Sequence, residues 1–219
     1  LTVVGLTEVQ VNLGAGNDRL LSDAGALLGN VQLRVFGEAG NDTIDAGAGN
    51  DVVDGGDDND SIIGGIGNDA LRGGIGNDTI NGQGGNDTIA GGDGADSILA
   101  GTGDDSISSG DGNDSVSGED GNDTISAGNG QDTVSGGNGN DKYYVNSGDG
   151  DTVNEAVGGG SDTVYVAGGE GASFALQAGS EVEFMRPGTG AHGVHFTGNE
   201  FVNTLYGKNG VVRSDSWPR

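Results

Sequence analysis

The sequence has no cysteine, few aromatic residues and very little positive charge. Without cysteine, no disulfide can hold a small core together. Only 8 lysine and arginine residues stand against 34 aspartate and glutamate residues, and the formal net charge is −26. Nucleic acids and anionic membrane surfaces attract basic patches, so we expect neither as a partner. The charge balance favours a cation instead.

Long apolar runs are also missing. No stretch approaches the roughly 18 apolar residues of a membrane-spanning helix, and no signal-peptide pattern is present, so we expect no membrane insertion. The chain opens at Leu1 in a strand-like run, and we expect it to be a piece of a longer polypeptide. With 49 glycines and 32% hydrophobic residues, the composition is compatible with disorder. Regular spacing of the acidic residues argues against disorder.

What the sequence does contain is a nine-residue repeat. Each repeat carries an aspartate, an apolar residue two positions later and, in eleven of twelve repeats, a glycine two positions earlier; Asp58 replaces that glycine before Asp60. The apolar residues are Ile44, Val53, Ile62, Leu71, Ile80, Ile89, Ile98, Ile107, Val116, Ile125, Val134 and Tyr143, which we expect to form the core. The aspartates are Asp42, Asp51, Asp60, Asp69, Asp78, Asp87, Asp96, Asp105, Asp114, Asp123, Asp132 and Asp141.

Residues 73–81, GGIGNDTIN, match the pattern G-G-x-G-x-D-x-U-x letter for letter. The repeats cover about half of the chain and resemble the RTX (repeats-in-toxin) family of secreted bacterial toxins and exoenzymes. The resemblance implies an all-β fold, a right-handed parallel β-roll (a β-helix or solenoid) with calcium between its turns. We expect irregular β caps at both ends.

The repeat length predicts how the chain winds. We expect each nonapeptide to form a glycine-rich turn of six residues and a strand of three, and two nonapeptides to complete one turn of the roll. Asp78 then lies between Asp60 and Asp96, not beside Asp69. We divide the chain into an irregular N-terminal repeat and cap (1–37), the roll of twelve nonapeptides (38–145), and a C-terminal flanking region with degenerate repeats (146–219).

Such stacking brings like charges together. Two carboxylates ~5 Å apart repel by about 3 kcal/mol at an effective dielectric of ~20, so a divalent cation between turns is expected. Calcium takes 6–8 oxygen ligands, whereas zinc or copper arrays would need cysteine or more than two histidines. A single Asn-Asp turn needs no bound metal, but twelve such turns in one register favour metal binding.

The resemblance implies that each calcium is shared between loops two repeats apart, from the pair Asp42 and Asp60 to the pair Asp123 and Asp141. Up to about ten ions are expected, with a weaker site at the loop of Asp60, and Asp18 in NLGAGNDRLLS is a further candidate. The expected backbone ligands are the carbonyls of Gly47, Gly49, Gly65, Gly67, Gly74, Gly76, Gly85, Gly92, Gly94, Gly101, Gly103, Gly110, Gly112, Gly121, Gly128 and Gly130.

The flanking segments are less regular. Between Asp18 and Asp42 we expect an insertion at 23–29 and a strand at 31–35 that leads back into the repeat. After Asp141, the aspartates Asp151 and Asp162 follow at spacings of ten and eleven.

Further along the chain, we expect Tyr143, Tyr144 and Tyr165 to cap the open end of the roll. We also expect a metal-free turn around Asn203, with Phe201 in the place of the glycine. The H-x-x-H of His192 and His195 is interpreted as exposed loop histidines, not as a zinc site.

Three classes of function remain. An enzyme is disfavoured because neither H-E-x-x-H nor G-x-S-x-G occurs. An ice-binding roll would repeat threonine three residues before each aspartate, and only Thr102 does so. The favoured hypothesis is a monomeric calcium-binding module that folds in extracellular calcium; secretion from a bacterium by type I machinery is what the resemblance implies. A structural or adhesive repeat of a surface or matrix protein is the alternative.

Overall fold

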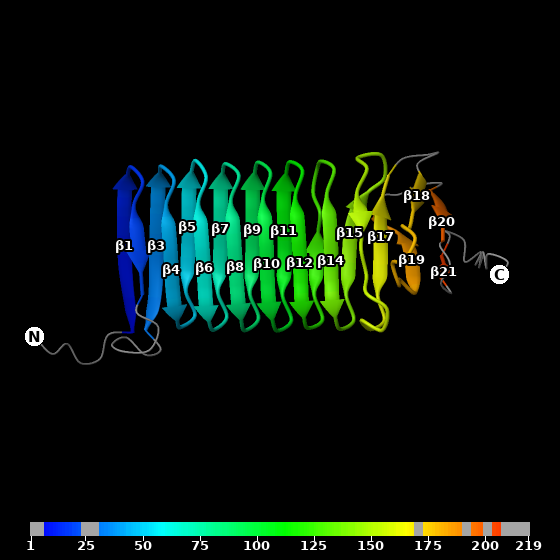
Figure 1. The fold of residues 1–219 in the computed structure, drawn as a ribbon, viewed down its shortest axis with the longest axis horizontal. Coiled ribbons are helices and arrows are strands. Elements are labelled where there is room, and N and C mark those ends of the chain that lie inside the picture. Colours follow the sequence, from blue (N-terminus) through cyan, green and yellow to red (C-terminus); the bar gives the residue numbers. More distant parts are fainter. Residues whose placement is uncertain (1–6, 23–30, 169–172, 190–193, 199–202, 207–219) are drawn as a thin grey trace, which may run out of the picture.

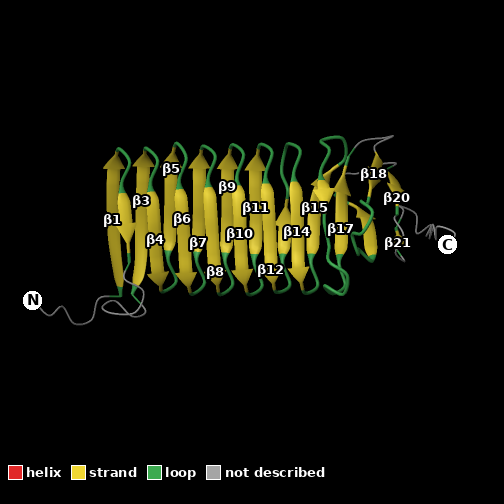
Figure 2. Ribbon diagram, viewed as in Figure 1, coloured by secondary structure: helices red, strands yellow, loops and turns green. Residues whose placement is uncertain are grey.

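The computed structural model describes residues 7–22, 31–168, 173–189, 194–198 and 203–206. In these ranges the chain is all β, and its strands stack side by side into an elongated solenoid with β1 at one end and β21 at the other (Figures 1 and 2). None of the described residues belongs to a helix with the length and apolar character needed to cross a membrane. The all-β prediction is confirmed.

Two long parallel sheets form the solenoid. Strands of odd number build an eleven-stranded sheet in the order β1-β3-β5-β7-β9-β11-β13-β15-β17-β19-β21. Their bounds are β1 Glu8–Ala15, β3 Gln32–Ala39, β5 Val52–Asp57, β7 Ala70–Ile75, β9 Thr88–Asp93, β11 Ser106–Asp111, β13 Thr124–Ser126, β15 Lys142–Asn146, β17 Thr163–Ala167, β19 Phe184–Pro187 and β21 Thr204–Leu205.

The second sheet has eight strands in the order β16-β14-β12-β10-β8-β6-β4-β2, and β18 pairs with β20 in a separate small sheet. The bounds are β2 Arg19–Leu21, β4 Thr43–Ala48, β6 Ser61–Ile66, β8 Thr79–Gly84, β10 Ser97–Thr102, β12 Ser115–Asp120, β14 Thr133–Asn138, β16 Thr152–Val153, β18 Ser173–Ala175 and β20 His195–Thr197.

Successive nonapeptides therefore alternate between the two sheets, and a strand pairs with the strand two repeats away. Ile80 in β8 lies beside Ile62 in β6 and Ile98 in β10. Two repeats make one turn, as the sequence predicts. The solenoid has the parallel β-roll architecture implied by the repeat.

The core consists of one column of apolar side chains from each sheet. Within a regular strand the buried positions alternate with more exposed ones, so Ile80 and Gly82 of β8 face inward while Thr79 is exposed. The apolar member is nearly inaccessible along the whole roll; Ile44, Ile80 and Ile89 are at most 1% exposed. Next to this column runs a second inward position, occupied by glycine, alanine or serine and, in the last repeat, by Val145.

The predicted division of each repeat into three strand residues and six turn residues is wrong. Regular strands such as β8 and β9 have six residues, with only residues 85–87 between them. The ladder continues across the glycine-rich positions, since Thr102 at the end of β10 pairs with Gly84 at the end of β8. The chain reverses direction within three residues, because the glycine of the turn adopts a positive φ that residues with a side chain rarely adopt.

Both sheets extend beyond the twelve regular repeats. Leu20 pairs with Ile44 despite the insertion between them, and β17, β19 and β21 continue the larger sheet. The predicted region boundaries, between residues 37 and 38 and between residues 145 and 146, fall inside β3 and β15. The division of the chain into three regions stays a prediction. Residues 23–29, His192 and Phe201 lie outside the described residues, while His195 is exposed in β20.

The three tyrosines do not cap the roll as predicted. Tyr143 is fully buried in β15, and Tyr144 stacks on Tyr165 of the next strand with ring centroids 5.0 Å apart. All three belong to the wall of the larger sheet, because β19 packs beyond them with its buried Met185.

Asp58 gives a test of the turn conformation. It has φ 76° where the neighbouring repeats carry Gly67 (φ 139°) and Gly76 (φ 143°). A residue with a Cβ is disfavoured in the left-handed region, and Asp58 also adds negative charge beside Asp60.

Asp58→Gly is therefore expected to raise the free energy of unfolding by about 1 kcal/mol in saturating calcium, measured by denaturant titration. Asp57→Gly, at an exposed strand position, is the control and should lower it by up to about 1 kcal/mol. A loss of stability in Asp58→Gly would contradict the strain at this turn.

Candidate metal centre

The repeated aspartates form two buried ladders along the roll. Every one of the twelve is between 1% and 3% exposed. The backbone N–H of Asp60 donates to Asp78 Oδ1 at 2.8 Å, and that of Asp78 donates to Asp96 Oδ1 at 2.8 Å. The same bond joins aspartates eighteen residues apart throughout, which confirms the predicted neighbours. One ladder holds Asp42, Asp60, Asp78, Asp96, Asp114 and Asp132, and the other Asp51, Asp69, Asp87, Asp105, Asp123 and Asp141.

Further acids continue both ladders. Asp18 donates its N–H to Asp42 Oδ1 at 2.8 Å, so this candidate occupies the ladder position that precedes the array. At the other end Asp132 donates to Asp151 Oδ1 at 3.2 Å and Asp141 to Asp162 Oδ1 at 2.9 Å. The spacing of ten and eleven residues conceals these two positions. The triplet Asp-Thr-Val at 151–153 and 162–164 is the sequence signal that marks them.

The second carboxylate oxygen of each ladder aspartate has no hydrogen-bond partner. All twelve Oδ2 atoms are buried and unpaired. Where the inward residue five positions earlier is glycine, the Oδ2 atom points at it: a Cβ placed on Gly73 would overlap Asp78 Oδ2 and lie 2.7 Å from the carbonyl oxygen of Gly91 in the next coil. Gly55, Asp60 and Gly73 repeat this arrangement. A carboxylate oxygen and a carbonyl oxygen therefore converge beside the inward glycine, and this arrangement recurs along the roll.

These inward carbonyls are not among the ligands predicted from the sequence. The sixteen predicted glycines all have positive φ, between 85° and 146°. Their carbonyl oxygens point along the axis: a Cβ on Gly65 would overlap Gly47 O, and one on Gly67 would overlap Gly49 O. Gly110 O accepts the N–H of Asn129 at 2.8 Å. Calcium ligation by the sixteen carbonyls stays a prediction, and the inward carbonyls are additional oxygen donors.

The asparagine before most repeat aspartates has a structural role. Asn59 donates its backbone N–H to Asn41 Oδ1 at 3.1 Å, and Asn77 donates to Asn59 Oδ1 at 2.6 Å. On the other side Asn68 donates to Asn50 Oδ1 at 2.9 Å. These exposed ladders satisfy backbone N–H groups in the turns. Turn asparagines thus align successive loops and hold the aspartates in register.

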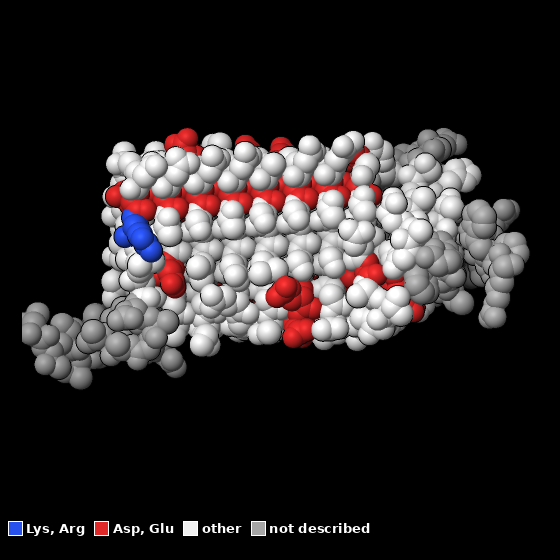
Figure 3. Space-filling view, viewed as in Figure 1, with Lys and Arg blue, Asp and Glu red and all other residues white. Residues whose placement is uncertain are grey.

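Burial of the ladders makes the ionised carboxylates costly. Burial, with a smaller contribution from the neighbouring carboxylates in the ladder, raises the pKa of Asp69 and Asp123 to about 7 against the lowering effect of the backbone N–H bond. Burial likewise raises the pKa of Asp60 and Asp96 to about 6. Acidic side chains form a row along the length of the solenoid (Figure 3). At neutral pH, bound cations or protons must compensate this charge.

The donors fit a hard divalent cation. The ladders place carboxylate and carbonyl oxygens close together, and these are the ligands that calcium takes. The sequence contains no thiol, and the described His195 lies exposed in β20, outside both ladders. The residues present therefore fit calcium and do not fit a thiophilic metal.

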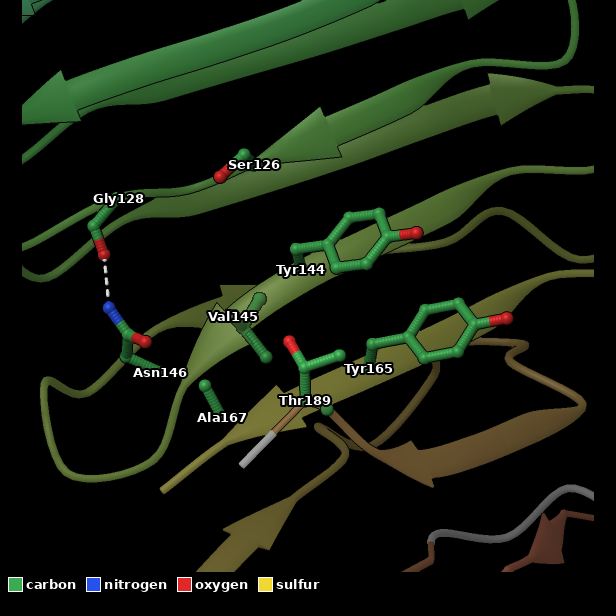
Figure 4. Close-up of a pocket in the computed structure, with 9 residues that line it drawn as sticks. Ser126, Gly128, Tyr144, Val145, Asn146, Tyr165, Ala167 and Thr189 are labelled. Carbon is green, nitrogen blue, oxygen red and sulfur yellow. Dashed lines mark hydrogen bonds between the residues drawn. The ribbon is translucent and has the colours of Figure 1, made fainter. Parts of the chain in front are cut away.

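A surface hollow lies apart from the ladders. It has a volume of about 200 Å³ and is lined by the stacked Tyr144 and Tyr165 together with Asn146, whose amide donates to Gly128 O (Figure 4). Its lining residues include no carboxylate, so it contributes nothing to the metal centre.

Comparison with known proteins agrees with this geometry. The RTX calcium-binding nonapeptide repeat matches the chain in four copies, at residues 34–62, 63–98, 90–125 and 117–151. Together the copies span residues 34–151, which is more than half of the 219 residues. A search of curated proteins found no match. The buried aspartate ladders lie within the matched repeats, and the chain belongs to the RTX calcium-binding nonapeptide-repeat family.

Proposed function

We propose that this chain is a calcium-dependent folding module of a secreted bacterial protein. The observation that carries the proposal is the set of twelve buried, unpartnered Oδ2 atoms in two ladders. Bound calcium would supply positive charge and oxygen coordination between successive coils. The twelve aspartates and the sixteen glycine carbonyls would hold up to about ten ions, with inward carbonyls such as Gly91 O as further ligands.

Calcium is preferred to magnesium on coordination grounds. Calcium accepts 6–8 oxygens at 2.3–2.6 Å in variable geometry, whereas magnesium requires a near-octahedral shell at 2.0–2.1 Å and keeps several waters. The donors here are fixed by a backbone repeat and are mostly carbonyls and shared carboxylates. A repeat of this kind suits calcium, which is the larger ion and has the more variable coordination geometry.

The folding role follows from mass action. An ion that binds only the folded chain stabilises it, and extracellular calcium modules have affinities of ~10⁻⁴–10⁻³ M. The chain would stay unfolded in the low calcium of the cytosol and fold outside the cell. The family membership supports secretion through type I machinery, and the role proposed is that of a monomeric, non-catalytic module.

Asp78→Asn tests the sharing of sites. Asp78 contacts Asp60 through its carboxylate and Asp96 through its N–H, so losing the charge should weaken two sites, each at least about tenfold. The amide oxygen can still accept the N–H of Asp60, which separates loss of charge from loss of fold. Calcium binding of the chain is measured by equilibrium dialysis.

The matched control is Asp57→Asn, which removes the same charge from an exposed position of β5 and should leave all sites intact. Weakening of a single site in Asp78→Asn would overturn the shared-site arrangement. An unchanged isotherm would overturn ligation by the ladder aspartates.

A further inference from the structure

Three buried carboxylates converge where the regular array ends. Asp141, Glu155 and Asp162 each offer an oxygen, and these atoms all lie within 4.8 Å of one another. The residues are 1%, 4% and 1% exposed. Asp141 and Asp162 precede β15 and β17 of the larger sheet, while Glu155 follows β16 of the smaller sheet. The cluster therefore combines the end of one aspartate ladder with a glutamate from the opposite wall.

Glu155 stands in the row of small inward residues. The regular repeats carry glycine, alanine or serine there, as at Gly136 in the coil before, and only the last of them carries a larger residue, Val145. Glu155 Oε1 accepts the N–H of Gly136 at 2.9 Å, the N–H of Gly137 at 3.1 Å and the hydroxyl of Tyr143 at 2.6 Å. Its own N–H donates to Ser180 Oγ at 3.0 Å. The glutamate is fixed in one orientation by four hydrogen bonds.

The remaining oxygens of the cluster have no partner. Asp141 Oδ2, Glu155 Oε2 and Asp162 Oδ2 are all buried without a hydrogen bond. Within the ranges that the structure describes, the ion pairs join Arg34 to Glu8 and Arg72 to Asp54, so neither reaches the cluster. Buried charges require a partner or coordinate a metal.

We propose that Asp141, Glu155 and Asp162 form a separate cation site that takes a divalent ion of the calcium class through three side-chain carboxylates. Sites between regular repeats share two aspartates between neighbouring coils and complete their shell with carbonyls. The glutamate adds a third carboxylate, and higher ligand charge raises calcium affinity. In the folded chain this site therefore binds calcium more tightly than the sites between regular repeats. The inference rests on the proposed function for the identity of the ion.

Glu155→Gln is the direct test, because the amide oxygen can keep the bonds from Gly136, Gly137 and Tyr143 while the charge is lost. In equilibrium dialysis the unaltered chain should bind one calcium at least about tenfold more tightly than the rest. Glu155→Gln should lose that tight ion and retain the others. Asp162→Asn, which can still accept the N–H of Asp141, should do the same.

The control is Glu119→Gln, which neutralises an exposed glutamate in β12 and should leave the tight ion in place. Identical isotherms for Glu155→Gln and the unaltered chain would overturn the site while leaving the repeat sites intact. Absence of any calcium binding by the unaltered chain would instead overturn the proposed function.

Tyr143 provides a second readout that does not depend on stoichiometry. Its hydroxyl lies 2.6 Å from Glu155 Oε1, so excitation of the phenol should sensitise emission from terbium(III) bound at the cluster. The first equivalent of terbium should give this emission, and calcium should compete for it. Tyr143→Phe should remove the emission and Tyr144→Phe should keep it. Emission that survives in Tyr143→Phe or in Glu155→Gln would place the first ion elsewhere.

Discussion

Removal of calcium by EDTA at neutral pH is expected to unfold the entire repeat region. Most strands of the roll bury only one large apolar side chain, such as Ile80 in β8 and Ile89 in β9, beside a column of mainly glycine, alanine and serine residues. Glycine loses more backbone entropy on folding than any other residue, so this thin core cannot offset the cost of ordering the chain. The buried aspartate ladders add like-charge repulsion of about 3 kcal/mol for carboxylates ~5 Å apart at an effective dielectric of ~20. Calcium reverses the sign of that last contribution.

Far-UV circular dichroism, which reports the β content of the chain, tests this prediction. The EDTA-treated chain should show a disordered spectrum, and calcium titration should restore the β signal in a cooperative transition at sub-millimolar to millimolar concentrations. Cooperativity is expected because each aspartate contacts the coils on both sides, as Asp78 does with Asp60 and Asp96. Magnesium at the same concentrations is the control and should fail to fold the chain. A β spectrum that persists in EDTA would contradict calcium-dependent folding.

Spacing alone predicts the regular part of the molecule. Identical nonapeptides can stack only in register, so placing Asp78 between Asp60 and Asp96 follows from the period of nine and two strands per turn. Strand length is harder to predict from the sequence, because a glycine such as Gly84 can occur either in a turn or in a parallel strand. The structure assigns it to the ladder.

The C-terminal cluster could not be predicted from spacing. Loops of irregular length separate Asp141, Asp151 and Asp162, which hides their common register. Tyr143 has the position of a core aliphatic residue, and its burial requires a partner for the hydroxyl. That partner is Glu155, twelve residues later and on the opposite wall. Contacts of this kind depend on how the two sheets face each other, which no local pattern encodes.

Acidification should stabilise the calcium-free fold and weaken its binding of calcium. In the calcium-free fold, the pKa of Asp69 and Asp123 is raised to about 7 from the ordinary value of 3.8. The folded state therefore binds protons more tightly than the unfolded state, and the free energy of unfolding increases as the pH falls from about 7 to about 4. Each affected carboxylate contributes up to about 1.4 kcal/mol per pH unit in this window. In EDTA, the β signal is therefore expected to be stronger at about pH 5 than at about pH 7.5.

Protons also compete with calcium for the same Oδ2 atoms, so the affinity of the folded chain for calcium should fall as the pH falls through about 7 to about 6. Asp69→Asn removes one titrating group while its amide oxygen can still accept the N–H of Asp51. This variant should show a weaker pH dependence in EDTA, greater calcium-free stability at neutral pH and weaker calcium binding. Asp57→Asn, which is exposed, should match the unaltered chain in pH dependence. Because burial is the largest cause of the raised pKa, a calcium-free chain that loses structure on acidification would show that the ladder carboxylates are not buried in that state.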